Sequence, residues 1–160
     1  MRDVDASSIV YGWDNYPIHQ FPALWDWVAE QIIERWLSIS RVAFDEVTTV
    51  SPECADWLRE NDILRKDVTN EIIITAVEIK NQLGIQNDNF HPKGVGENDI
   101  LIIATAKVAG VELISDESRQ TTLPPALPRY KMPAVCALPN VAVPCISFID
   151  YIKQSNRRFG

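Results

Sequence analysis

Carboxylates at the ends of short apolar segments are the residues of this sequence best suited to chemistry. Asp99 precedes an apolar run that ends at Gly110, and a second apolar run then leads to Ser115, Asp116 and Glu117. This pattern predicts an acid at the start of a buried helix, a glycine stop, and a short strand that delivers a hydroxyl and a carboxylate. Ligand groups collect at the carboxyl ends of parallel strands, so we expect these side chains to meet at one edge of a sheet.

Two more acids lie in similar settings upstream. Asp5 follows a short N-terminal segment, and Glu46 follows the segment Arg-Val-Ala-Phe at residues 41–44. Two carboxylates about 4 Å apart repel each other by roughly 4 kcal/mol at an effective dielectric constant near 20, so a cluster of four favours a bound cation. Oxygen ligands suit Mg²⁺ or Mn²⁺, which can activate water, and phosphodiester hydrolysis is the matching chemistry.

Each of these polar residues has a predicted role at such a site. We expect Asp5 and Asp99 to bind the metal directly, and Glu46 and Glu117 to bind it or to support the ligands. We expect the hydroxyls of two serines to orient carboxylates or water. The serines are Ser7 and Ser115, and Asp116 is a further supporting acid.

Several of these assignments have alternatives within the sequence itself. Asp5 and Asp99 also fit helix N-caps, a role that is compatible with metal binding. Glu46 stands beside Asp45, and Glu117 stands beside Asp116, which would point to the other face of a continued strand. The residue types alone therefore leave the third and fourth acids open.

Helices and strands alternate along the chain in the order that a doubly wound α/β domain requires. Strands are predicted near residues 2–5, at residues 41–44, before Ser115 and near residues 142–145. Pro22 and Pro52 suit first helical turns, Gly84 suits a helix end, and a last helix is expected from about Ser147. Two sets of apolar residues at helical spacing mark buried helix faces. The sets are Leu24, Val28, Ile32 and Trp36, and Ile72, Ala76, Ile79 and Leu83. We expect a three-layer α/β/α fold with a mainly parallel sheet.

Length and composition place the chain among globular proteins. Its 160 residues, 46% of them hydrophobic, fit one domain over residues 1–160 with a substantial core. No apolar run approaches the roughly 20 residues of a membrane span, and the first residues do not read as a signal peptide. The three cysteines, Cys54, Cys136 and Cys145, form no CxxC pair and are expected to be buried thiols in a reducing compartment. We therefore expect a cytoplasmic protein without membrane contact.

Net charge limits the kind of nucleic-acid binding that is expected. The formal charge of −7 argues against a strong nonspecific binder, because phosphate contacts supply most of that affinity. Bound metal would cancel part of the negative charge. Lys131, Lys153, Arg157 and Arg158 supply positive charge late in the chain that could contact a phosphate backbone or form a solvated tail.

The segment from Asp99 to Glu117 resembles the C-terminal signature of PIN domains, the metal-dependent ribonuclease fold of VapC-type toxins. Residues 5–7, Asp-Ala-Ser, match the Asp-x-Ser/Thr/Asn opening of that family. A narrower resemblance is to a PIN-like family of unknown function. Its features are an early Pro- and Trp-rich segment, here residues 16–27, and a late basic-Met/Ile-Pro-x-Val-Cys stretch, here residues 131–136.

The resemblance implies a function and partners. It implies a metal-dependent endoribonuclease that acts on RNA with Asp5, Glu46, Asp99 and Glu117 as its acids. It also implies the toxin of a bacterial toxin–antitoxin pair, held inactive by a protein antitoxin, with a DNA-binding regulator as a plausible neighbour. Exposed tryptophans would anchor that partner or a homodimer. We expect these among Trp13, Trp25 and Trp27.

Two other functions remain as alternatives. Residues 3–7 also fit the Asp-x-Asp-x-Ser/Thr opening of haloacid-dehalogenase-like phosphatases, and residues 96–99 resemble their Gly-Glu-Asn-Asp element. However, only two residues precede Asp3, whereas the nucleophile of that family follows a buried strand. The second alternative is a PIN-like binding or regulatory module without turnover, which would be expected to lack acids that this chain retains.

Overall fold

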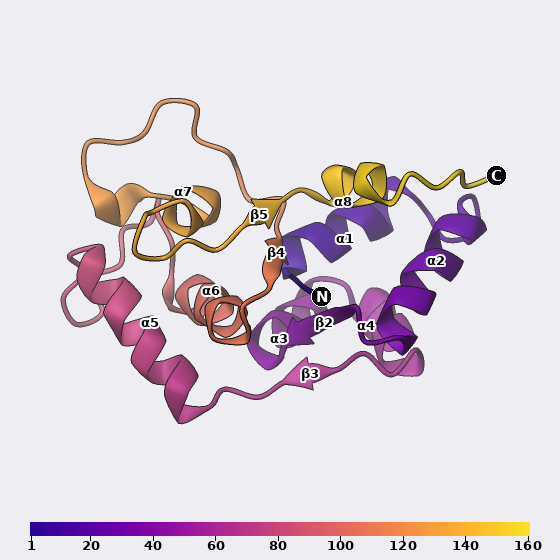
Figure 1. The fold of residues 1–160 in the computed structure, drawn as a ribbon, viewed down its shortest axis with the longest axis horizontal. Helices are drawn as coiled ribbons and strands as arrows, with labels where there is room; N and C mark the ends of the chain where they lie inside the picture. The colour runs from indigo at the N-terminus through magenta and orange to yellow at the C-terminus, as the bar shows by residue number, and fades with distance from the viewer.

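Five short parallel strands form the centre of the protein, which the computed structural model describes over residues 1–160. The strands are β1 (Arg2–Val4), β2 (Leu37–Ser40), β3 (Arg65–Lys66), β4 (Glu112–Ile114) and β5 (Cys145–Ile146). They pair in the order β3-β2-β1-β4-β5, and every pair is parallel. Figure 1 shows the strands near the centre, with α5 and α6 to one side and α2 and α8 to the other. The prediction of a three-layer α/β/α fold is confirmed.

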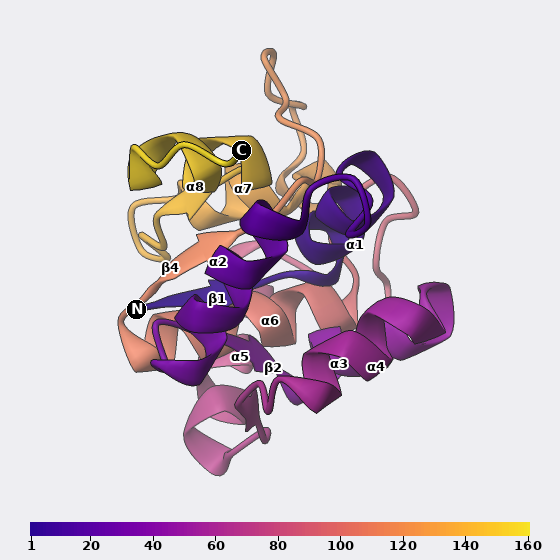
Figure 2. The same cartoon turned by 90° about the vertical axis from the view of Figure 1, so that its right-hand side faces the viewer.

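Eight α-helices and one short 3₁₀ helix connect and cover the strands. They are α1 (Ala6–Asn15), α2 (Pro22–Ile33), α3 (Arg41–Val50), α4 (Pro52–Glu60), α5 (Asn70–Gln82), α6 (Glu97–Ala109), η1 (Leu127–Arg129), α7 (Met132–Cys136) and α8 (Phe148–Ser155). Figure 2 shows the connection from β4 to α7 projecting from the body of the molecule, away from α5.

Local sequence explains where several helices begin and end. Pro22 and Pro52 each occupy a first helical position, where a missing N–H costs nothing. Ser147 accepts a hydrogen bond from the backbone N–H of Asp150 at 3.1 Å and so caps α8. Gly110 ends α6 in the left-handed conformation, with φ at 67°.

A single connected apolar core fills both sides of the sheet. It includes Ile39 of β2 and Leu113 of β4, which are fully buried, and the α6 residues Ile102 and Ile103. Burial of side chains of this size contributes about 1.5–3 kcal/mol each. The core therefore holds the helix starts and strand ends in fixed positions, which is what a site at the sheet edge requires.

The second predicted strand was wrong. Residues 41–44 form the first turn of α3, and the strand lies earlier, at Leu37–Ser40. All four strand residues are buried, and Ser40 accepts a hydrogen bond from the backbone N–H of Ala43 at 3.0 Å. A buried strand with two serines does not look apolar in sequence, and its last residue is already the cap of the next helix.

Four smaller differences concern element boundaries. Trp36 lies outside α2 and is 56% exposed, because Arg35 adopts a positive φ of 63° and turns the chain before it. The last strand is Cys145–Ile146 rather than residues 142–145. The two-residue β3 was missed because it carries no apolar side chain, and the short helix α7 was not predicted.

A close backbone contact brings the segment before α7 onto the start of α6. A Cβ at Gly94 would lie 1.9 Å from the carbonyl oxygen of Pro128, so only glycine fits there. The neighbouring Val95 N–H donates to the carbonyl oxygen of Tyr130 at 3.0 Å. These contacts place residue 131 beside the helix start that carries Asp99.

The helices are all too short or too polar to cross a lipid bilayer.

Candidate functional site

The four candidate acids come from four different parts of the fold and lie near one another at the carboxyl edge of the sheet. Asp5 directly follows β1, Glu46 lies in the second turn of α3, Asp99 lies in the first turn of α6, and Glu117 follows β4 by three residues. Because β1 and β4 pair in parallel, their ends leave the sheet at the same edge. Mutual electrostatic effects, described below for each acid, show that the four carboxylates are neighbours.

Asp5 is the most buried of the four and is held by two hydroxyls. Its side chain is 2% exposed, and its Oδ2 accepts hydrogen bonds from Ser7 at 2.6 Å and Ser115 at 3.2 Å. Asp5 stands at the N-cap of α1, but its side chain makes no capping hydrogen bond. Burial raises the pKa of Asp5, the two serines lower it, and the charge of Asp99 raises it. The carboxylate is thus oriented toward the other acids rather than used as a cap.

The same two serines order the chain that leads to Glu117. Ser7 Oγ accepts a hydrogen bond from the backbone N–H of Asp116 at 2.9 Å, and Ser115 Oγ accepts one from that of Glu117 at 3.2 Å. The two hydroxyl oxygens lie 3.3 Å apart. The segment after β4 is therefore connected to Asp5 through hydroxyls, as expected for groups that orient carboxylates.

Asp99 is positioned by its own helix. Its Oδ2 accepts a hydrogen bond from the backbone N–H of Gly96 at 2.9 Å, which satisfies one of the free donors at the start of α6. Burial raises the pKa of Asp99, while the Gly96 hydrogen bond and the charge of Lys131 lower it. Asp99 lies at the third helical position rather than at the N-cap, and its other oxygen remains available.

Glu46 and Glu117 are half-buried, and the neighbouring carboxylates raise the pKa of both. Burial, followed by the charges of Asp5 and Asp99, raises the pKa of Glu46 to about 7, against an ordinary value of 4.5, and Glu117 adds to this. Burial and the same two aspartates also raise the pKa of Glu117. Unpaired negative charges at close range thus disfavour ionisation of the whole group.

Asp116 lies apart from this cluster. Its Oδ1 accepts a hydrogen bond from the backbone N–H of Phe148 at 2.9 Å, at the first turn of α8. Burial raises its pKa, while the Phe148 hydrogen bond and the charge of Arg119 lower it. Asp116 therefore fixes α8 to the end of β4, and Glu117 is the acid of this pair that faces Asp5 and Asp99.

Asp3 has a different environment from the nucleophile that the phosphatase alternative requires. It is 2% exposed, and its Oδ1 accepts hydrogen bonds from Lys66 Nζ at 2.6 Å and Ser38 Oγ at 2.8 Å. A substrate could not reach a carboxylate that is buried and paired in this way. This geometry argues against the phosphatase alternative.

Lys131 is the site residue that sequence reasoning did not assign to the cluster. Its charge lowers the pKa of both Asp99 and Glu117. Its backbone N–H donates to Gln120 Oε1 at 2.9 Å, which fixes its position on the loop before α7. Lys131 is the first residue of the basic-Met-Pro motif, which is visible in the sequence. The position of that motif beside the start of α6 is not visible there, because it depends on the contact at Gly94. Asn98, whose side chain lowers the pKa of Glu46, was also missed.

The chemistry of the donor set fits a hard divalent cation. Its charged members are four carboxylates against the single positive charge of Lys131, and the serine hydroxyls and the Asn98 amide add further oxygen atoms. No group of three or more His, Cys, Asp or Glu side chains is arranged to hold a metal ion as it stands. Repulsion keeps carboxylates apart unless positive charge lies between them.

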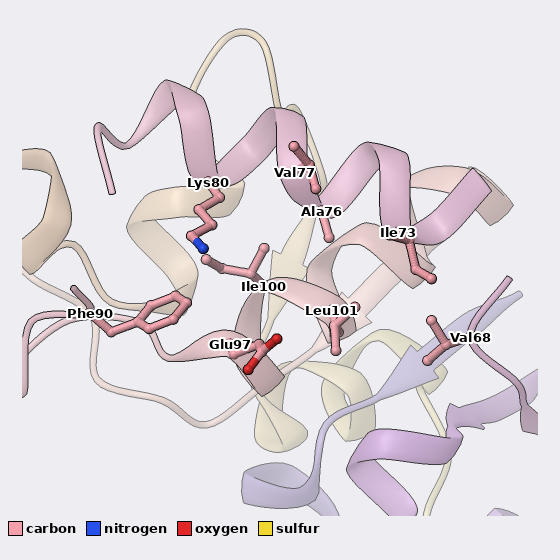
Figure 3. Close-up of a pocket in the computed structure, with 9 residues that line it drawn as sticks. All are labelled: Val68, Ile73, Ala76, Val77, Lys80, Phe90, Glu97, Ile100 and Leu101. Carbon is pink, nitrogen blue, oxygen red and sulfur yellow. The ribbon is translucent and has the colours of Figure 1, made fainter. Parts of the chain in front are cut away.

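Two surface depressions lie near these elements. One, of about 500 Å³, is lined by Glu46 and Asn98 together with Asp45, Thr49 and others of α3. The other, of about 340 Å³, is an apolar groove between α5 and α6, with Lys80 and Phe90 at one end (Figure 3). The exposed α5 residues Ile73 and Val77 contribute to its wall.

The expected tryptophan anchors are mostly internal. Trp25 and Trp27 are buried, at 1% and 5% exposure, so the expectation that they anchor a partner was wrong. Trp13 is half-buried and packs against Trp25 and Trp57 with ring centroids 5.3 and 6.0 Å apart. These rings form an aromatic core between α1, α2 and α4.

Comparisons with known proteins give a family and, among the solved structures, a distant neighbour. The chain is similar to a solved structure described as a toxin–antitoxin complex from Klebsiella pneumoniae. The TM-score is 0.48 and the sequence identity is 16%, over 78% of this chain and 93% of that chain. No curated protein matches the sequence. Residues 3–159 match the family model described as Domain of unknown function (DUF4411). The chain therefore belongs to the DUF4411 family.

Proposed function

We propose that this protein is a PIN-like endoribonuclease that hydrolyses RNA with Mg²⁺ or Mn²⁺. The observation that carries the proposal is the convergence of four carboxylates from four elements, each with a raised pKa. Groups whose charges destabilise one another have few structural uses, and clusters of this kind occur where a cation or a reaction compensates them.

Asp5, Glu46, Asp99 and Glu117 would hold the ion. When bound, such an ion lowers the pKa of water and stabilises charge on a phosphoryl oxygen. Ser7 and Ser115 keep the Asp5 carboxylate in one orientation.

Lys131 would bind the substrate. It is the positive charge that lowers the pKa of both Asp99 and Glu117, and it can pair with a phosphate oxygen. One such contact suits an acidic protein that engages RNA at a single site rather than along a broad basic surface.

The biological role we propose is that of a toxin in a toxin–antitoxin pair, acting in the cytoplasm and restrained by a protein antitoxin. An acidic cluster of this kind would accept a basic side chain of such a partner. Apolar side chains on and near α5, which include Ile73 (48% exposed) and Ile74 (60% exposed), offer contact area for a partner protein. A homodimer would use surface of the same kind.

RNA cleavage by the purified protein tests the proposal. We expect cleavage with Mg²⁺ or Mn²⁺, none with a chelator, and a loss of at least about 100-fold for Asp5→Asn and Asp99→Asn, because each removes a charge that the reaction requires. Asp26→Asn is the control, since Asp26 is exposed on α2. Expression of the wild type alone should slow growth, and the two site variants should relieve this.

Variants of residues 45 and 46 test which of these two acids belongs to the site. Glu46→Gln should lower the rate strongly, and Asp45→Asn should not, because Asp45 is exposed. If neither metal supports cleavage and the wild type is as harmless as both site variants, the protein is better described as a PIN-like binding module.

A further inference from the structure

Cys136 and Cys145 form a pair of thiols that the proposed nuclease chemistry does not use. Cys136 is the last residue of α7, and Cys145 is the first residue of β5. The backbone N–H of Val143 donates to the carbonyl oxygen of Cys136 at 3.0 Å, which holds the end of α7 against the approach to β5. Both side chains are free thiols, and the two residues line the same surface depression.

Arg119 connects this thiol pair to the candidate active site. Its Nη2 donates to the Cys145 sulfur at 3.8 Å. Its Nη1 donates to the carbonyl oxygens of Ser115 at 2.5 Å and Glu117 at 3.0 Å. One guanidinium therefore contacts both Cys145 and the backbone of the segment that carries Ser115 and Glu117.

The environment of the pair distinguishes it from the third cysteine. The thiol of Cys136 and the charge of Arg119 lower the pKa of Cys145, although burial opposes this. Burial raises the pKa of Cys54 to about 12, and Cys54 has no sulfur neighbour. Cys145 is partly exposed in this depression, of about 380 Å³, and Cys136 is buried behind it. A thiolate beside a cation and open to solvent is the reactive kind.

We propose that Cys145 is an oxidation site that forms a disulfide with Cys136 when a peroxide is present, and that this modification loosens residues 115–117. The Cys145 thiolate attacks a peroxide oxygen, the O–O bond breaks, and the leaving hydroxide takes up a proton to become water. The Cys136 sulfur then attacks the Cys145 sulfenic acid and the S–O bond breaks. The proton of Cys136 leaves with the hydroxyl group as a second water. Two thiols are oxidised and one peroxide is reduced.

Disulfide formation changes the contact of Arg119. The Cys145 sulfur turns toward Cys136 and, as a disulfide sulfur, is a poor hydrogen-bond acceptor, so Arg119 loses its contact at β5 and its two carbonyl contacts weaken. The amide of Glu117 and its carboxylate then gain freedom. That this affects activity rests on the proposed function, whereas the disulfide and the loosening of the segment do not.

Peroxide treatment of the reduced full-length protein tests the proposal. Intact mass should fall by the mass of two hydrogen atoms, and peptide mapping without reductant should show a Cys136–Cys145 cross-link while Cys54 remains a thiol. Amide hydrogen exchange over residues 116–119 should be about fivefold faster after oxidation, the effect of weakening one hydrogen bond. Reductant should reverse both changes.

Variants give each step its own readout. Cys54→Ala should behave as the wild type. Cys136→Ser should stop at a Cys145 sulfenic acid that a 1,3-diketone traps. Arg119→Gln should slow alkylation of Cys145 by about tenfold near neutral pH. The proposal is overturned if Cys54 oxidises as fast as Cys145, or if the cross-link forms and exchange over residues 116–119 does not change. RNA cleavage by the reduced protein is measured separately, so failure of the nuclease assignment is recognised independently.

Discussion

The chemistry of single residues explains why Glu46 is the most informative acid of the site. Asp5 and Asp99 are each satisfied in part by hydrogen bonds from Ser7, Ser115 and Gly96. Among the groups that shift the pKa of Glu46, only the side chain of Asn98 favours the charged form. Its raised pKa therefore reports its burial first and then the charges of the other three acids.

Burial and the neighbouring charges together predict a pH dependence of stability without metal. Glu46 releases its proton near 4.5 when the chain is unfolded and at about 7 when it is folded. Between these values the folded state binds more protons, so stability is lost as the pH rises through the window. We expect Glu46→Gln, which stays neutral, to melt at a higher temperature than the wild type at about pH 8, with the difference shrinking toward about pH 5.

Thermal unfolding in a chelating buffer measures this difference. Asp45→Asn on the same helix is the matched control, because Asp45 is exposed and should leave the melting curve nearly unchanged at every pH. A Glu46→Gln difference that stays constant between about pH 5 and 8 would contradict the assigned repulsion.

At the same scale, the sequence allowed the identity of the clustered acids to be predicted but not their surroundings. Asp5 and Asp99 could be chosen from their places after a short predicted strand and before an apolar run, whereas the choice of Glu117 rested on the resemblance to PIN domains. Lys131 could not, because its approach depends on the close contact of Gly94 with Pro128, some 34 residues away in sequence. The roles of the acids as metal ligands stay predictions.

Among the elements, the three strands on one side of the sheet show what sequence patterns miss. β2 contains buried Ser38 and Ser40, and β3 consists of Arg65 and Lys66. Neither segment has the run of apolar residues that predicts a strand. Their polar side chains are instead used in specific hydrogen bonds and an ion pair. α5, α6 and their glycine ends were predicted correctly, because long amphipathic or apolar helices with stop signals are set by local sequence.

A buried ion pair fixes these three strands together. Lys66 of β3 reaches Asp3 of β1 at 2.6 Å, with Ser38 of β2 as a third member. Removing Lys66 alone leaves a buried charge without a cation, so we expect Lys66→Met to cost about 3–5 kcal/mol in the free energy of unfolding. Asp3→Asn combined with Lys66→Met should recover much of this loss, because no charge is then buried.

Denaturant unfolding of the two single variants and the double variant measures the coupling. An exposed pair, Arg41 with Asp67 at 3.1 Å, provides the comparison, since Arg41→Ala should cost less than about 1 kcal/mol. Equal losses for Lys66→Met and Arg41→Ala would show that the β1–β3 contact does not hold the sheet edge.

For the whole molecule, the distribution of charge matters more than its total. The chain carries 22 acids and 15 lysines and arginines, and at least four of the acids are brought together at one edge of the sheet. Folding therefore concentrates negative charge that the unfolded chain would spread out. An ion that binds only the folded cluster should offset this repulsion and so raise the free energy of unfolding.

Divalent cations should accordingly raise the melting temperature. At 100 times its dissociation constant, an ion that binds only the folded state contributes about 2.7 kcal/mol, which corresponds to about 5–10 °C for a domain of this length. Asp99→Asn should abolish most of the increase with Mg²⁺ or Mn²⁺, while its amide oxygen can still accept the Gly96 hydrogen bond. Asp26→Asn, with an exposed site of substitution, should keep the full increase. Equal increases for the wild type and Asp99→Asn would mean that the ion binds elsewhere on the surface, and the acidic cluster would then need a different explanation.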